Sequence, residues 1–139
     1  MLEMYKKVVF SNYANFKGRA RRNEYWYFTL TNIILFICFL AIGGLVGLIF
    51  GEAGSGAGLG YLCYILYLFL TFLPSLAVTV RRLHDTEKSG LLMLLGIIPF
   101  GGIVVLVFLC TEGTRGANKY GADPKNEYEE LIELGKDLN

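Results

Sequence analysis

The sequence is short of the side chains that build most active sites. It has one histidine, one tryptophan and three cysteines in 139 residues. Cys38 and Cys63 lie inside apolar runs and Cys110 ends another, with no metal-ligand spacing between them, so we expect buried, unpaired thiols. No glycine-rich phosphate loop, zinc motif or nucleophile elbow is present. We therefore expect no catalytic residue, no metal and no cofactor.

Charge is absent from three long stretches of the chain. These are 26–50 (25 residues), 59–80 (22 residues) and 91–110 (20 residues). A helix of about 20 apolar residues crosses the ~30 Å hydrocarbon core of a bilayer. A soluble domain of this size has too little interior for so much apolar surface, and barrel strands would alternate apolar with polar residues. The pattern predicts an all-α membrane protein with three transmembrane helices.

The third apolar run leaves two interpretations open. "GIIPFGG" (96–102) interrupts it, and Pro99 removes a helical hydrogen bond and can kink the helix. At 1.5 Å per residue, 20 residues reach about 30 Å, which only just spans. We prefer a continuous helix over 91–110, which places the C-terminal tail outside. The alternative is a re-entrant hairpin with Pro99 at its tip, which keeps the tail inside.

Lysine and arginine are distributed unevenly between the ends of these runs. Residues 1–25 carry a net charge of +4, and the loop 81–90 contains Arg81, Arg82 and Lys88. The glycine-rich loop 51–58 has one acid and no base. Because short cytoplasmic loops are enriched in Lys and Arg, we predict a cytoplasmic N-terminus and a cytoplasmic 81–90 loop.

The N-terminal segment 1–22 has the pattern of an amphipathic interfacial helix that ends near Gly18. An ordinary helix packed on the protein's own loops explains the pattern equally well. We treat 1–125 as the membrane domain and 126–139 as an acidic C-terminal tail. The apolar side chains that recur at helical spacing are Leu2, Tyr5, Val9, Tyr13 and Phe16.

Three glycines follow one side of the first apolar helix. Gly43, Gly47 and Gly51 are four residues apart, and small residues at this spacing let two membrane helices approach closely. We prefer the second helix of the same chain as the partner, because a three-helix protein must pack itself first. Another subunit is the alternative.

The charged residues flanking the apolar runs are the candidate site. Guanidinium groups bind phosphate through paired hydrogen bonds, and bases beside membrane helices attract anionic lipids. The plain alternative is that these bases only orient the chain. Glu24 and Asp85 are predicted to pair with arginines and lock the helices together. The candidate phosphate or headgroup ligands are Arg19, Arg21, Arg22, Arg81, Arg82 and His84.

Three sequence blocks resemble a known family. They are "FKGRARRNEYW" (16–26), "RRLHDTEKSG" (81–90) and "GTRGANKYGADP" (113–124), the last following "IPFGG". In this order around three apolar runs they closely resemble the bacterial inner-membrane family called domain of unknown function 805, and its small YhaH-like members most. The likeness extends from about Tyr5 to Pro124. It implies a multi-pass inner-membrane protein and implies no reaction.

The functional expectation is a non-enzymatic protein of the bacterial inner (cytoplasmic) membrane. Its basic cytoplasmic face would engage anionic lipid headgroups or a partner membrane protein, including a second copy of itself, and no nucleic acid. One alternative is a small holin-like pore-former, motivated by the glycine face and the small size. A second is an enzyme that modifies lipid headgroups with His84 and Asp85.

Overall fold

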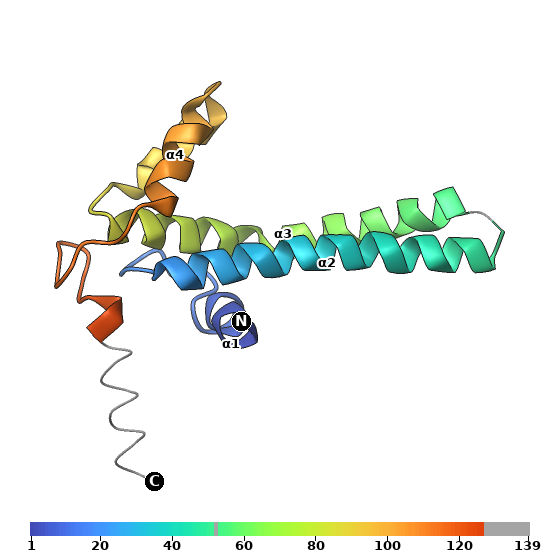
Figure 1. The fold of residues 1–139 in the computed structure, drawn as a ribbon, viewed down its shortest axis with the longest axis horizontal. Helices are drawn as coiled ribbons and strands as arrows, with labels where there is room; N and C mark the ends of the chain where they lie inside the picture. The colour runs from blue at the N-terminus through green and yellow to red at the C-terminus, as the bar shows by residue number, and fades with distance from the viewer. Residues whose placement is uncertain (52, 127–139) are drawn as a thin grey trace, which may run out of the picture.

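The computed structural model describes residues 1–51 and 53–126, and its regular elements there are all helices. In chain order they are α1 (Leu2–Lys6), the π-helical turn η1 (Lys7–Ser11), α2 (Arg22–Ile49), α3 (Ala53–Asp85), the 3₁₀-helix η2 (Gly90–Ile97) and α4 (Gly101–Cys110). Figure 1 shows α2 and α3 side by side as a long pair, with α1 and α4 extending away from it near one end. We call this end the charged end. It contains the start of α2, the end of α3 and the segments 12–21 and 111–126.

Helices α2 and α3 are long, apolar and mostly uncovered. They have 28 and 33 residues, which is about 42 and 50 Å of helix. Over the 18 most apolar consecutive residues of each helix, the buried share is 6% in α2 and 28% in α3. Both helices are long and apolar enough to cross a membrane. The expectation of buried cysteines is wrong, because Cys38, Cys63 and Cys110 are exposed on this apolar surface.

Both long helices extend beyond the predicted boundaries. Helix α2 begins four residues before Trp26, and α3 continues to Asp85 and also includes most of the glycine-rich stretch. The predicted range 59–80 is therefore too short at both ends. The two helices pack through glycines there: a Cβ on Gly43 would lie 2.5 Å from the Gly56 carbonyl oxygen and 2.9 Å from the Gly60 Cα.

The close approach of the two helices shows which helix packs against the glycines of α2. A Cβ on Gly56 would overlap the backbone of Gly43 and Gly47, so α3 of the same chain occupies this face. Gly51 does not take part. It lies in the turn after α2 with a φ of +84°, a conformation that favours glycine.

The N-terminal segment forms a shorter helix than the sequence predicts. It is helical only from Leu2 to Ser11, and Gly18 does not end it but lies in a later turn with a φ of +80°. Its inner side packs on the protein itself, since Val8 is fully buried with Phe28 and Val78. The Tyr5 and Tyr67 hydroxyls are 2.7 Å apart and join this segment to α3.

Pro74 explains where the N-terminal segment is held. Pro74 lies inside α3 and has no N–H, so the carbonyl of Leu70, four residues earlier, loses its helical donor. The Tyr13 hydroxyl donates to that Leu70 oxygen at 2.7 Å. A side chain from the N-terminal segment therefore satisfies the backbone group that the proline frees.

The third apolar run is not a single helix, which corrects the preferred interpretation of 91–110. It divides into η2 and α4, of eight and ten residues, and each is too short for a ~30 Å hydrocarbon core. Pro99 favours an extended residue before it, and Ile98 is extended with ψ 138°. Phe100 then takes a positive φ of 65°, and a Cβ on Gly101 would overlap the Leu95 carbonyl oxygen. The chain turns back at Pro99, as the hairpin alternative described.

The hairpin of η2 and α4 is anchored to α3 at the charged end. Leu83 of α3 is buried with Val105 and Leu109 of α4. This contact returns the chain to the charged end, where residues 111–126 continue. The acidic tail predicted over 126–139 lies outside the described residues from position 127 onward.

Candidate functional site: a buried charged cluster and the cleft beside it

The end of α3 presents its charged side chains in different directions. Arg81 and Arg82 are adjacent in the last turns, so they project about 100° apart around the helix axis. The helix then stops because Glu87 takes a φ of 59° while the Lys88 N–H bonds the Leu83 carbonyl oxygen at 3.0 Å. This terminating turn fixes the Arg81, Arg82 and Asp85 side chains relative to the rest of the charged end.

Arg81 binds the start of α2. Its Nη1 lies 2.7 Å from Oε1 of Glu24, and the two side chains are 3% and 2% exposed. Lys7, which is half exposed, approaches the other carboxylate oxygen at 3.4 Å. Glu24 also lies in the first turn of α2, where the helix dipole favours an acid. The pair joins α2 to α3, in the way predicted for Glu24.

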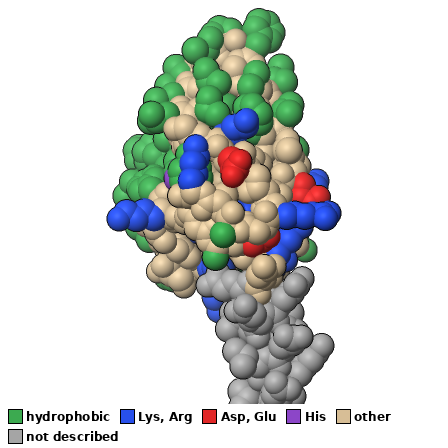
Figure 2. Space-filling model, turned by 90° about the vertical axis from the view of Figure 1, so that its left-hand side faces the viewer, with side chains coloured by type: hydrophobic (Ala, Val, Ile, Leu, Met, Phe, Trp, Pro, Cys, Tyr) green, Lys and Arg blue, Asp and Glu red, His purple; other side chains and the backbone are tan. Residues whose placement is uncertain are grey.

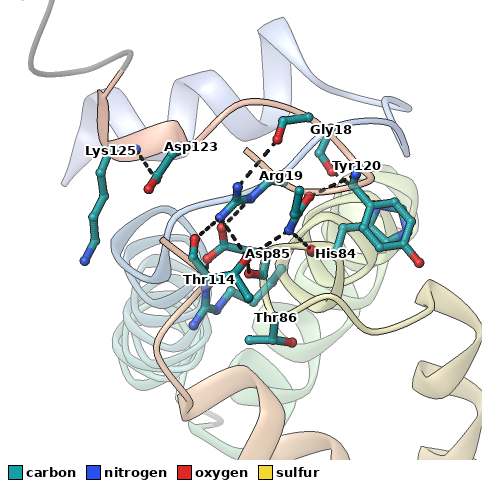
Figure 3. Close-up of polar contacts among 12 residues, drawn as sticks. Gly18, Arg19, His84, Asp85, Thr86, Thr114, Tyr120, Asp123 and Lys125 are labelled. Carbon is teal, nitrogen blue, oxygen red and sulfur yellow. Dashed lines mark hydrogen bonds and ion pairs between the residues drawn. The ribbon is translucent and has the colours of Figure 1, made fainter. Parts of the chain in front are cut away.

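Asp85 lies between two arginines. Its Oδ1 accepts from Arg19 Nε at 2.9 Å and its Oδ2 accepts from Arg82 Nη1. All three side chains are at most 6% exposed. Figure 3 shows Arg19 and Asp85 at the centre of the contacts that join segment 12–21, the end of α3 and segment 111–126. We call Arg19, Arg82 and Asp85 the Asp85 cluster.

The two arginines of the Asp85 cluster also bind backbone carbonyls of the C-terminal segment. Arg19 donates to the carbonyl oxygens of Thr114 and Gly116, both at 2.5 Å. Arg82 donates to the Leu109 oxygen at 3.2 Å and to the Thr111 oxygen. These internal contacts occupy the guanidinium groups of both arginines. The structure therefore shows Arg19 and Arg82 bound within the protein, and their contact with headgroups stays a prediction.

The third sequence block holds residues that the sequence analysis did not assign to the site. The Thr114 N–H donates to the Asp85 carbonyl oxygen at 2.8 Å. A Cβ on Gly113 would overlap the Asp85 carboxylate, so glycine is required beside it. The Asn118 amide donates to the His84 carbonyl oxygen at 3.0 Å. The order of the three blocks was the available signal, but only the fold shows that they meet.

His84 is held by its neighbours. Its Nδ1 is 3.2 Å from the Gly18 carbonyl oxygen, and its ring stacks on Tyr120 at 3.8 Å between centroids, as Figure 3 shows. Within residues 1–51 and 53–126, no group of three His, Cys, Asp or Glu side chains could hold a metal ion. The geometry places His84 as a link between segments.

Asp123 closes the loop of the C-terminal segment. Its carboxylate accepts from the Lys125 N–H at 3.0 Å and from the Gly116 N–H at 2.8 Å. The Lys125 backbone bond is the main cause that lowers the pKa of Asp123 from its ordinary 3.8, with burial opposing it and the Gly116 bond adding to it. The ionised carboxylate therefore stabilises this loop.

A cleft of about 690 Å³ lies between the N-terminal and C-terminal segments, and we call it the Arg81 cleft. Among residues 1–51 and 53–126, four bases line it, Lys7, Lys17, Arg19 and Arg81, and Asp123 is the one lining acid. Nε and Nη2 of Arg81 are buried and have no hydrogen-bond acceptor among the described residues. A buried donor left without an acceptor costs about 1–3 kcal/mol. In this respect Arg81 differs from Arg19, Arg82 and Asp85, whose charged groups all have hydrogen-bond partners within the protein.

Exposed bases surround this buried charge. Arg22 is exposed and Arg21 is half-buried, so of the predicted ligands Arg22 is the one open to the surroundings. Figure 2 looks onto the charged end and shows Lys and Arg around its edge, with hydrophobic side chains gathered above them. We call the exposed bases the basic rim. They are Lys6, Lys7, Lys17, Arg22, Lys88, Arg115, Lys119 and Lys125.

Two long apolar helices with a shared charged end define a helical membrane protein. The chain belongs to the family described as "Protein of unknown function (DUF805)", which matches residues 13–122 and so includes every segment of the Asp85 cluster. This confirms the family expected from the three sequence blocks. The chain is thus a bacterial inner-membrane protein with apolar helices, of a family without an assigned activity.

Two relatives from Escherichia coli (strain K12) cover most of the chain. Inner membrane protein YhaI is 52% identical over 118 residues, which is 84% of this chain and 92% of that protein. Inner membrane protein YhaH is 47% identical over 127 residues, which is 91% of this chain and 99% of that protein. No solved structure matches the chain.

Proposed function

We propose that this chain is a non-enzymatic inner-membrane protein whose charged end lies on the cytoplasmic side and engages anionic lipid headgroups. One observation carries the proposal: every Lys and Arg among the described residues lies in segments 1–22, 81–88 or 111–125, while residues 23–80 have none. Cytoplasmic segments beside membrane helices are the ones enriched in these bases.

The lengths of the helices support headgroup contact. Helix α3 is about 50 Å long, whereas a bilayer with its headgroups is about 40–45 Å thick. A spanning α3 therefore brings its last turns to the headgroup layer or just beyond it. There the basic rim adds about 1 kcal/mol of attraction per base to an anionic surface.

The two side extensions of the fold support an interfacial position. The N-terminal segment exposes Leu2 and Phe10, and the η2–α4 hairpin exposes Ile97 and Phe100. Both extend away from the axis of the α2–α3 pair near the charged end, as Figure 1 shows. Apolar side chains in that position are suited to lie in the boundary between headgroups and acyl chains.

The topology follows from the same arrangement. Segments 1–22 and 111–126 meet at one end of the α2–α3 pair, so we propose that both are cytoplasmic and that the η2–α4 hairpin does not cross the membrane. Reporters active only in the cytoplasm or only in the periplasm, fused separately to each end of the chain, test this. A periplasmic signal at the C-terminal fusion contradicts the proposed topology.

The lipid contact is tested by lipid selectivity at the protein surface. The protein is reconstituted in phosphatidylcholine with a trace of spin-labelled phosphatidylglycerol or spin-labelled phosphatidylcholine. We expect preferential association of the anionic label, and we expect added salt to weaken it. The triple variant Lys88→Gln, Arg115→Gln, Lys119→Gln removes three exposed rim charges and should reduce the preference.

A matched control shows whether position or polarity matters. Ser55→Gln introduces the same polar side chain on the exposed surface at the opposite end of α3, and it should leave the preference unchanged. An equal affinity of wild type for both labels contradicts lipid engagement. In that case the partner membrane protein becomes the better explanation of the basic rim.

A further inference from the structure

The Arg81 cleft has an unusual balance of charge. Among the described residues four bases and one acid line it, and two buried acids pair with three of those bases: Glu24 with Arg81 and Lys7, and Asp85 with Arg19. Asp123, its acid, already accepts two backbone N–H bonds. Lys17 is exposed at the cleft and its ammonium group makes no ion pair with the described residues. Lys17 is therefore the lining base whose charge is available to an anion.

Arg81 supplies the geometry for one kind of anion. Glu24 takes up Nη1, and the two nitrogens without an acceptor, Nε and Nη2, lie on the same edge of the guanidinium plane. Two parallel N–H groups on one edge are the fork that binds two oxygens of a carboxylate or a phosphate. The side chain is 3% exposed, so its interaction with an anion is little screened by water.

We propose that the Arg81 cleft is a binding site for a phosphomonoester group, with Arg81 as its anchor and Lys17 and Lys7 completing the charge. The two free donors of Arg81 and the Lys17 ammonium group are together suited to three oxygens, and a phosphomonoester presents three terminal oxygens where a phosphodiester presents two. The volume of about 690 Å³ admits a phosphate together with an attached headgroup. This inference rests on the proposed function in placing the cleft at the headgroup layer, and it adds one specific, saturable site to the general attraction of the basic rim.

The same chemistry has two sources, a lipid and a soluble molecule. Phosphatidate carries a phosphomonoester at the membrane surface, and inorganic phosphate or glycerol 3-phosphate carries it in the cytoplasm. The first arm of the test titrates sodium phosphate and glycerol 3-phosphate into the full-length protein in detergent by calorimetry. The second arm counts lipids retained by the protein after release from nanodiscs of phosphatidylcholine with phosphatidate or phosphatidylglycerol, by native mass spectrometry.

Three variants separate the site from the rim. Lys17→Gln should weaken phosphomonoester binding about fivefold, the equivalent of about 1 kcal/mol for one base. Lys88→Gln removes the same charge from an exposed base that does not line the cleft, and it should change binding less than twofold. Arg81→Lys keeps a charge beside Glu24 but loses the fork, and it should weaken binding at least tenfold.

Each outcome has one meaning. Binding of the soluble phosphates that depends on Lys17 supports a soluble ligand, and retention of phosphatidate alone that depends on Lys17 supports a lipid ligand. Equal effects of Lys17→Gln and Lys88→Gln, or no preference for a phosphomonoester in either arm, overturn the site while leaving the lipid selectivity of the rim intact. Because Lys17 is exposed, this comparison stands even where Arg81→Lys fails to fold.

Discussion

Replacing Asp85 with asparagine tests whether the three segments of the charged end are held by one carboxylate. Asp85 separates two buried arginines, and its side chain is 6% exposed against 1% for Arg19 and 0% for Arg82. Asparagine has nearly the same shape but no charge. The variant therefore leaves both guanidinium groups buried without their counter-ion, while the glycine contact at Gly113 is kept.

The expected loss is large for a single substitution. Removing one partner of a buried ion pair typically costs about 3–5 kcal/mol, because the remaining charge stays buried. Since one asparagine oxygen can still accept a hydrogen bond, we expect the lower part of that range, about 3 kcal/mol. For a chain of this length such a loss lowers the melting temperature on the order of 10 °C.

Two measurements report different parts of this effect. Thermal unfolding in a mild detergent reports the total loss, and limited trypsin digestion at Arg115 and Lys119 reports release of the C-terminal segment. Glu87→Gln is the matched control, because it removes an exposed acid two residues away. If Asp85→Asn has the same melting temperature as Glu87→Gln and wild type, and trypsin cleaves at Arg115 and Lys119 no faster than in wild type, the Asp85 cluster does not hold the segments together.

Two further predictions test the helix contact and the C-terminal loop. Gly56→Ala places a methyl group against the α2 backbone and should lower the free energy of unfolding by about 1–3 kcal/mol. Gly58→Ala is the control, because its methyl group meets open space and should not destabilise the protein. Equal melting temperatures of the two variants contradict the close contact between the helices. Asp123 contributes stability while ionised, above its ordinary pKa of 3.8, and loses it as the pH falls through its lowered folded pKa. The protection factor of the Gly116 amide, which is corrected for the intrinsic pH dependence of exchange, should therefore fall as the pH drops below about 4 in wild type, and an identical pH profile in Asp123→Asn contradicts this assignment.

The class of protein could be predicted from composition alone. Long uncharged runs require helices in lipid, and this holds whatever the tertiary contacts are. The same reasoning underestimated both long helices, because it stopped them at the charged residues of the charged end and began the second helix only after the glycine-rich stretch. Arg81, Arg82 and Asp85 remain helical since their charges are paired inside the chain. A rule based on charge alone has no access to that pairing.

The third run shows a limit of reasoning from length. Twenty apolar residues suffice to span, and a proline is tolerated in many membrane helices. What turns the chain is the combination of Pro99, the positive φ of Phe100 and the absence of a side chain on Gly101. The return is then fixed by the packing of Val105 and Leu109 on Leu83, a contact between residues far apart in sequence.

The sequence by itself determined the helical membrane class, the family, and the bases and acids that form the charged end. It determined these because hydropathy, charge distribution and residue order are properties of the chain. Only the tertiary structure decided which arginine meets which acceptor. Arg19 and Arg82 bind within the protein, while Arg81 keeps two donors without an acceptor among the described residues. That difference depends on how segments about 60 to 100 positions apart pack together, and adjacent arginines in a sequence carry no sign of it.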